Sequence, residues 1–187
     1  LVYAIKLLLE KSSVLKSYSD INVISSNSIE EIKRFTIEAA SQTLEGESLA
    51  LVIGGLYELY MNSISDNYNV EVHPVNQSGA SSREISDIDI YKGNKLFITN
   101  ELKDKVFHVT DVLHAVRKVQ ENQFNKIMFI KGLNGRLDDG NEKELEERML
   151  IREGFYLKFC GVIEFTEFML ALIEKPDINI FYSAVIT

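Results

Sequence analysis

The sequence is poor in the residues that cross-link or interrupt a chain. Its 187 residues include one cysteine, Cys160, and two prolines. A single cysteine rules out a disulfide within the chain and excludes a zinc site built on clustered cysteines. With so little proline and no low-complexity tract, nothing marks a linker, and we expect one domain over residues 1–187.

Long apolar runs are also missing. No stretch reaches the roughly 18 residues that cross a bilayer, and no basic-then-apolar segment ends in a signal-peptide cleavage site. We therefore expect a cytoplasmic protein. The chain starts at Leu1 without an initiator methionine and is apolar at both ends, which suggests a piece of a longer protein.

Basic residues are outnumbered by acidic ones. Lys and Arg total 20 and Asp and Glu total 28, for a formal net charge of −8. Binding to the phosphates of nucleic acid depends on Lys and Arg, so this balance lowers the odds of DNA binding. It does not exclude DNA, because an acidic pocket that recruits a divalent cation must itself be negative.

Hydrophobic periodicity predicts helices and strands that largely alternate, around a core supplied by the 45% hydrophobic content. A strand hairpin followed by β-α-β alternation predicts an α/β fold, a mixed sheet with a central hairpin and helices on both faces. No state is predicted after Pro176. We expect helices over 28–43, 47–65, 110–122 (capped by Thr110), 142–153 and 165–174, and strands over 69–75, 85–91, 95–102, 126–131 and 155–160.

Two neighbouring strands carry charged residues near their ends. Asp87 and Asp89 share one face of their strand, and Glu101 and Lys103 share one face of the next, because side chains on a strand alternate. Two carboxylates suit Mg²⁺, which prefers oxygen ligands. An adjacent ammonium can stabilise the charge that develops on a phosphate. Two acids and one lysine are therefore the parts that phosphodiester hydrolysis requires.

The hairpin turn decides whether the first pair of charges meets the second. A two-residue turn at 93–94 would pair odd positions with even ones and place Asp87 and Glu101 on opposite faces. A three-residue loop over 92–94 pairs Asp87 with Thr99 and brings Asp87 to the face of Glu101. A metal site on this hairpin therefore predicts a three-residue loop or an equivalent bulge.

The pattern resembles the PD-(D/E)xK nuclease superfamily, with residues 70–129 most similar to type II restriction endonucleases. Asp87, the run Glu101-Leu102-Lys103 and the helix from Thr110 match the family order, although Ser86 stands where the family commonly has Pro. The resemblance implies a Mg²⁺-dependent endonuclease that acts on double-stranded DNA as a homodimer. It also implies a catalytic core over 47–175 after a helical N-terminal part over 1–45.

The resemblance also implies roles for individual residues. The catalytic residues would be Asp87, Glu101 and Lys103, and the metal ligands Asp87, Glu101 and the backbone carbonyl of Leu102. Asp89 stays open as an alternative to Asp87, and Glu58 as an accessory acid. Polar loop residues near strand ends, together with one lysine, are candidate DNA contacts: Gln77, Ser81, Ser82, Arg83 and Lys105.

Two other functions remain open. Gly79-Ala80-Ser81 followed by Asp87-Ile88-Asp89 resembles the Gly-Ser and Asp-x-Asp signature of nucleotidyltransferases, in which both aspartates hold Mg²⁺. The segment between these motifs is short for the helix that family has there, and the motif leaves Glu101 and Lys103 unexplained. A catalytically inactive nuclease fold that only binds DNA is the non-enzymatic alternative.

Overall fold

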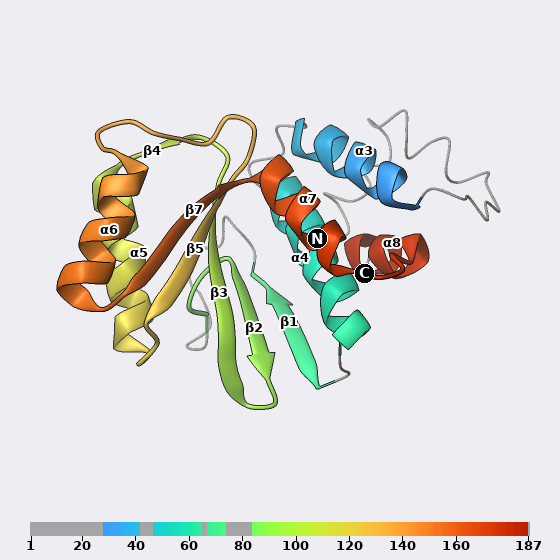
Figure 1. Ribbon diagram of the computed structural model, residues 1–187, viewed down its shortest axis with the longest axis horizontal. Helices are drawn as coiled ribbons and strands as arrows, with labels where there is room; N and C mark the ends of the chain where they lie inside the picture. The colour runs from blue at the N-terminus through green and yellow to red at the C-terminus, as the bar shows by residue number, and fades with distance from the viewer. Residues whose placement is uncertain (1–27, 42–46, 65–66, 74–83, 187) are drawn as a thin grey trace. The chain divides into compact units, whose positions relative to one another are not determined.

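The computed structural model describes residues 28–41, 47–64, 67–73 and 84–186 (Figure 1). The described residues form two compact units. One combines the chain up to Asp66 with Val162–Thr187, and the other comprises Asn67–Gly161. The charged hairpin lies in the second unit.

A five-stranded mixed sheet is the centre of the second unit, which confirms the mixed α/β class. The first three strands in the order are antiparallel, and the last three are parallel. The strand order is β1 (Tyr68–Val72), β2 (Ile88–Lys92), β3 (Lys95–Lys103), β5 (Lys126–Lys131) and β7 (Tyr156–Gly161). The two-residue strands β4 (Val106–Phe107) and β6 (Arg136–Leu137) pair separately, and such short elements have no periodicity to reveal them.

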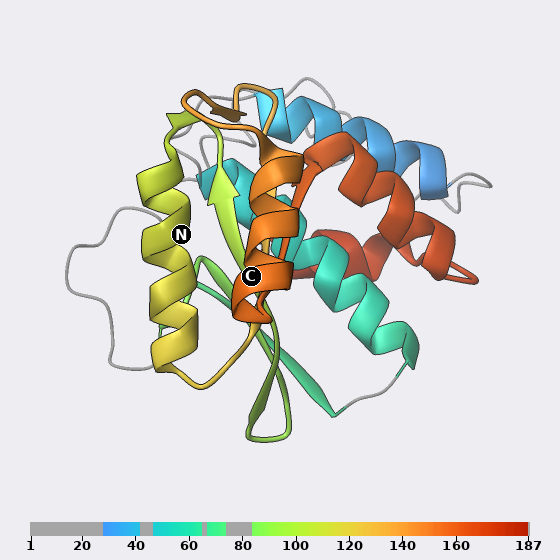
Figure 2. The ribbon, with the colours of Figure 1, turned by 60° about the vertical axis from the view of Figure 1, so that its left-hand side comes forward.

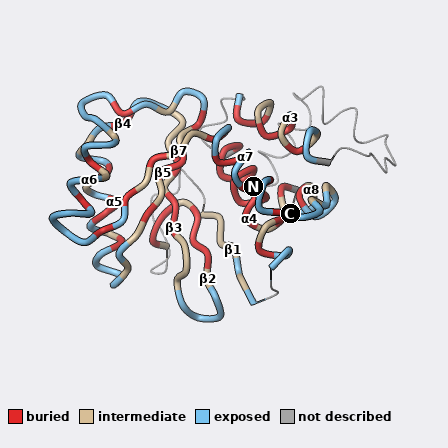
Figure 3. The backbone as a smooth tube through the Cα atoms, viewed as in Figure 1, coloured by how far each residue is buried: buried red, intermediate tan, exposed pale blue. Residues whose placement is uncertain are grey.

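Helices α5 (Val109–Glu121) and α6 (Glu142–Glu153) lie side by side on one face of this sheet (Figure 2). Their buried side chains share one apolar cluster with β5 and β7. Within it, the rings of Phe107, Phe129 and Phe159 have centroids 5.3–6.3 Å apart. Burial of these aromatic side chains anchors the parallel strands, and Figure 3 shows the buried positions along them.

The ends of these two helices test the capping predictions. Asn141 caps α6 by accepting from the Glu144 amide, and Gly154 ends it in the left-handed conformation at φ 60°, so its predicted bounds are confirmed. The prediction that Thr110 caps α5 is wrong. The N-cap is His108, whose amide donates to the Asp111 carboxylate at 2.8 Å.

The first unit is helical. It consists of α3 (Ser28–Ser41), α4 (Glu47–Ile64), α7 (Val162–Leu172) and α8 (Ile178–Ile186). Aromatic contacts connect these helices. The ring centroids of Phe35 on α3 and Phe181 on α8 are 5.5 Å apart. Those of Tyr57 on α4 and Phe165 on α7 are 5.2 Å apart. None of the described helices combines the length and the apolar content that a bilayer-spanning segment needs.

Candidate active site

The turn between β2 and β3 has two residues, Gly93 and Asn94, so of the two predicted alternatives, a three-residue loop or an equivalent bulge, the loop is not the one present. Lys92 pairs directly with Lys95 across it. Gly93 has φ 58°, which glycine adopts without the steric cost that a side chain brings. A turn of this length without further change would leave odd residues of β2 opposite even residues of β3.

A bulge in β3 reverses that outcome. Tyr91 pairs with Leu96, but Ile90 pairs with Ile98, so Phe97 is an extra residue on β3. The Phe97 ring lies against the Tyr68 ring, at 5.2 Å between centroids. Odd-numbered residues of β2 therefore lie opposite odd-numbered residues of β3. This is the bulge that the metal-site hypothesis gave as the alternative to a three-residue loop.

Asp87 lies just before β2, and continuation of the register places it opposite Glu101. Its Oδ2 accepts a hydrogen bond from the Leu102 amide at 2.7 Å, so the side chain takes the place of a ladder partner on β3. Burial, and secondly the charge of Glu101, raise the pKa of Asp87 to about 7. The Leu102 amide and the ammonium groups of Lys103 and Lys118 oppose this rise only in part.

Glu101 and Lys103 form an ion pair on the same face of β3. Lys103 Nζ donates to Glu101 Oε1 at 2.7 Å, and both side chains are about one-fifth exposed, at 19% for Glu101 and 20% for Lys103. Burial alone would lower the pKa of Lys103, but the charge and hydrogen bond of Glu101 and the charge of Asp87 raise it above its ordinary value. Lys103 is therefore a cation that can donate hydrogen bonds, rather than a base.

The backbone of Leu102 adds an oxygen to the same edge. The N–H and C=O of one strand residue point to the same side of the strand. Because the Leu102 amide donates to Asp87, its carbonyl also faces the Asp87 side. The candidate donor set is thus two carboxylates and one carbonyl. In the part of the chain that the structure describes, no group of three or more His, Cys, Asp or Glu side chains is arranged to hold a metal.

Sequence reasoning did not predict that the loop after β5 fixes the end of β3. The Gly132 amide donates to the Lys103 carbonyl at 2.9 Å. A Cβ at Gly135 would lie 2.0 Å from that same carbonyl oxygen, so the close approach requires glycine there. Two glycines in a polar loop were the available signal, but the sequence does not show which strand they contact.

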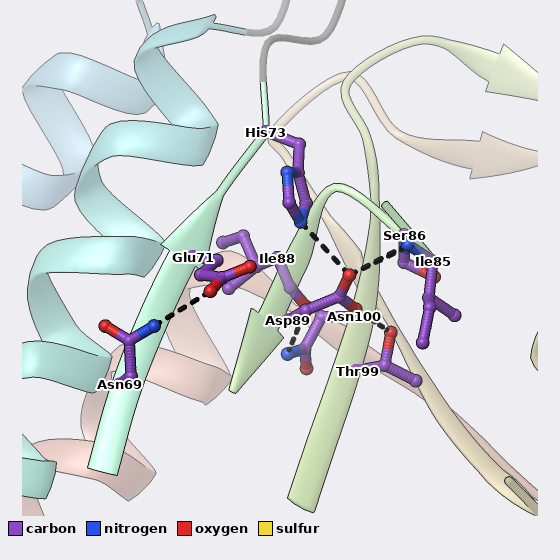
Figure 4. Close-up of polar contacts among 9 residues, drawn as sticks. All are labelled: Asn69, Glu71, His73, Ile85, Ser86, Ile88, Asp89, Thr99 and Asn100. Carbon is purple, nitrogen blue, oxygen red and sulfur yellow. Dashed lines mark hydrogen bonds and ion pairs between the residues drawn. The ribbon is translucent and has the colours of Figure 1, made fainter. Parts of the chain in front are cut away.

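Asp89 lies on β2, and its environment differs from that of Asp87; Figure 4 shows the residues around Asp89. Its side chain is fully buried, and Oδ1 accepts from Thr99 Oγ1 at 2.6 Å. Oδ2 accepts from the Ile85 and Ser86 amides at 2.9 and 3.4 Å and lies 3.1 Å from His73 Nε2. Both oxygens are therefore engaged by donors of the protein.

His73 was overlooked as a functional residue because its partner is distant in sequence. Its hydrogen bond to Asp89 raises the pKa of His73, with burial as the main opposing effect. Its amide also donates to the Asp87 carbonyl at 2.8 Å. The β1–β2 register, which sequence alone does not give, brings this histidine to both aspartates.

The remaining candidate residues are in the helical unit, in the segment after β3, or outside the described residues. Glu58 is on α4 in the helical unit, and burial raises its pKa. Lys105 is exposed between β3 and β4. The proposed DNA contacts Gln77, Ser81, Ser82 and Arg83 lie outside the described residues. These assignments all stay predictions.

Residues 20–133 match the family model described as the SacI restriction endonuclease C-terminal domain. This segment covers more than half of the chain and contains Asp87, Glu101 and Lys103. No curated protein matches the sequence significantly.

Proposed function

Because the chain belongs to the SacI restriction endonuclease C-terminal domain family, we propose that it is a type II restriction enzyme that hydrolyses double-stranded DNA with Mg²⁺. The observation that carries this proposal is the β3 bulge. It brings odd-numbered residues of β2 and β3 opposite one another, and Asp87, directly before β2, lies close enough to the Glu101–Lys103 pair for both charges to act on it.

The donor set fits a hard divalent cation. Asp87, Glu101 and the Leu102 carbonyl offer only oxygen, as Mg²⁺ prefers. Burial, and secondly the charge of Glu101, raise the pKa of Asp87, and a bound cation would offset both effects. Bound there, Mg²⁺ would supply Lewis-acid stabilisation of negative charge on the phosphate that is cut.

Lys103 supports the same chemistry. As a cation beside Glu101, it can orient a water molecule toward the phosphorus atom and stabilise the pentavalent transition state. Asp89 does not enter this assignment, because four protein donors already surround its carboxylate. Cutting both strands of a duplex takes two such sites, which a homodimer would provide.

Plasmid cleavage tests the proposal. The wild-type chain should nick and linearise supercoiled plasmid with Mg²⁺ and not with EDTA. Glu101→Ala and Lys103→Ala should each lose about 10²–10³-fold or more in rate, the size typical for removal of one group that stabilises the transition state. Lys95→Ala, at the exposed far end of the same strand, is the matched control and should cut at the wild-type rate.

Three other results would overturn the assignment. Cleavage that survives both Glu101→Ala and Lys103→Ala would remove these residues from the mechanism. Nucleotide transfer from a triphosphate that Asp89→Ala abolishes would favour a nucleotidyltransferase. Metal-independent DNA binding without cleavage would indicate an inactive module.

A further inference from the structure

Asp89 connects three separate segments of the second unit. It accepts from the amides of Ile85 and Ser86, directly before Asp87, from Thr99 on β3, and from His73 at the end of β1 (Figure 4). Because Asp89 Oδ2 also accepts from two backbone amides, His73 Nε2–H is the donor in this contact. The Asp89 side chain is fully buried, and the His73 side chain is 13% exposed.

This network determines where β2 begins. The sequence predicts a strand from Ile85, but β2 starts at Ile88. The amides of Ile85 and Ser86 turn inward to Asp89 instead of joining the ladder. The segment before β2 therefore folds back on the side chain of Asp89, and Asp87 lies at the end of this turn.

The turn determines where the Asp87 carboxylate points. Asp87 lies directly before β2 and directs its own side chain to the Leu102 amide. The backbone carbonyl of Asp87 is held from the other side by the His73 amide at 2.8 Å. One end of the turn is thus bound to Asp89 itself, and the other is bound to His73, which also contacts Asp89.

We propose that Asp89 is a positioning residue for Asp87, which holds the 85–87 turn so that the Asp87 carboxylate faces the Leu102 edge. The inference rests on the proposed function, since it gives Asp87 the role of metal ligand. Groups that orient metal ligands without touching the metal are often nearly as important as the ligands themselves.

Mg²⁺ binding without DNA is the direct test, measured by titration calorimetry on the 187-residue chain. Asp89→Asn replaces one acceptor oxygen with an amide N–H₂, which meets either the backbone donors or Thr99. We expect Mg²⁺ affinity to fall about 10–100-fold, the usual effect of such a change. Glu71→Gln is the matched control, because Glu71 lies opposite Asp89 on β1 but bonds Asn69 instead, and it should leave affinity within about twofold.

A double-variant comparison separates positioning from direct ligation. If Asp89 acts through Asp87, adding Asp89→Asn to Asp87→Asn produces no further loss of Mg²⁺ affinity. If Asp89 were itself a ligand, the second substitution would weaken binding again, and the proposal would be wrong. Plasmid cleavage by Asp89→Asn should also recover most of the wild-type rate at saturating Mg²⁺, whereas Asp87→Asn should not.

A milder variant, Thr99→Val, tests the proposal if Asp89→Asn does not fold. Thr99→Val keeps the shape and removes only the donor to Asp89 Oδ1. If Asp89→Asn does not fold, a several-fold loss of Mg²⁺ affinity in folded Thr99→Val supports the proposal, and unchanged affinity overturns it. A wild-type chain that neither binds Mg²⁺ nor cuts DNA would instead overturn the proposed function. Wild-type affinity in a folded Asp89→Asn variant would overturn only the role of Asp89.

Discussion

Asp87 and Asp89 lie two residues apart in the sequence, yet their surroundings are opposite. Asp89 has four protein donors around its two oxygens. Among the described residues, Asp87 has one hydrogen-bond donor, the Leu102 amide. A second carboxylate, that of Glu101, is close enough to raise its pKa. A carboxylate saturated with donors stabilises the backbone around it, whereas an under-compensated one favours the binding of a cation.

Removal of the saturated carboxylate should have the largest effect on stability. Asp89→Ala leaves the buried amides of Ile85 and Ser86, the Thr99 hydroxyl and His73 without their acceptor. We expect a loss of about 3–5 kcal/mol in the free energy of unfolding, as for other broken buried networks. Urea denaturation measures this, with Glu71→Ala as the control. A loss below about 1 kcal/mol would show that Asp89 is not saturated in solution.

The under-compensated carboxylate should behave in the opposite way. The folded pKa of Asp87, about 7, is raised above its ordinary value of 3.8, so its contribution to stability is complete below pH 4 and is lost as pH rises to about 7. In Mg²⁺-free buffer, Asp87→Asn should therefore be more stable than wild type at pH 8, by on the order of 1–3 kcal/mol. The asparagine can still accept from the Leu102 amide.

Urea denaturation between pH 4.5 and 8 checks this prediction. The stability difference between Asp87→Asn and wild type should shrink steadily as pH falls. Asp138→Asn, which changes an exposed carboxylate away from the hairpin, serves as the control. A difference that is independent of pH, or that favours wild type, would contradict the account of Asp87 as a costly buried charge.

The smallest effect is expected at Ser86, directly before Asp87. Ser86 Oγ is buried, and among the described residues it has no hydrogen-bond partner. Ser86→Ala keeps the backbone amide that donates to Asp89 and removes this unpaired hydroxyl. We expect unchanged or slightly greater stability, by up to about 1 kcal/mol. A thermal melt is sufficient, and a clear loss of stability would show that the hydroxyl has a partner.

Local signals explain which parts of the fold could be predicted. The bounds of α6 follow from Asn141 and Gly154, and those of β5 from an apolar run between two lysines. The β3 bulge has no such signal at Phe97. It depends on packing against Tyr68, which lies on another strand, so sequence reasoning could state only that a longer loop or a bulge was required.

The candidate site likewise contains residues that local sequence signals predict and residues that they do not. Glu101 and Lys103 were found together because alternation along a single strand needs no knowledge of strand pairing. The choice between Asp87 and Asp89 depends on how their donors are arranged. His73 is 16 residues from Asp89 in sequence and Thr99 is 10 away, and both reach it only through tertiary register.

The extra residue at Phe97 limits how this hairpin can change during evolution. Deletion of one residue from β3 before Thr99, or insertion of one into the turn at Gly93 and Asn94, would rotate Glu101 and Lys103 to the opposite face of the sheet. The two changes made together would restore the arrangement. Loop length and bulge should therefore vary as a linked pair among related sequences, with single-residue insertions and deletions tolerated only when one compensates for the other.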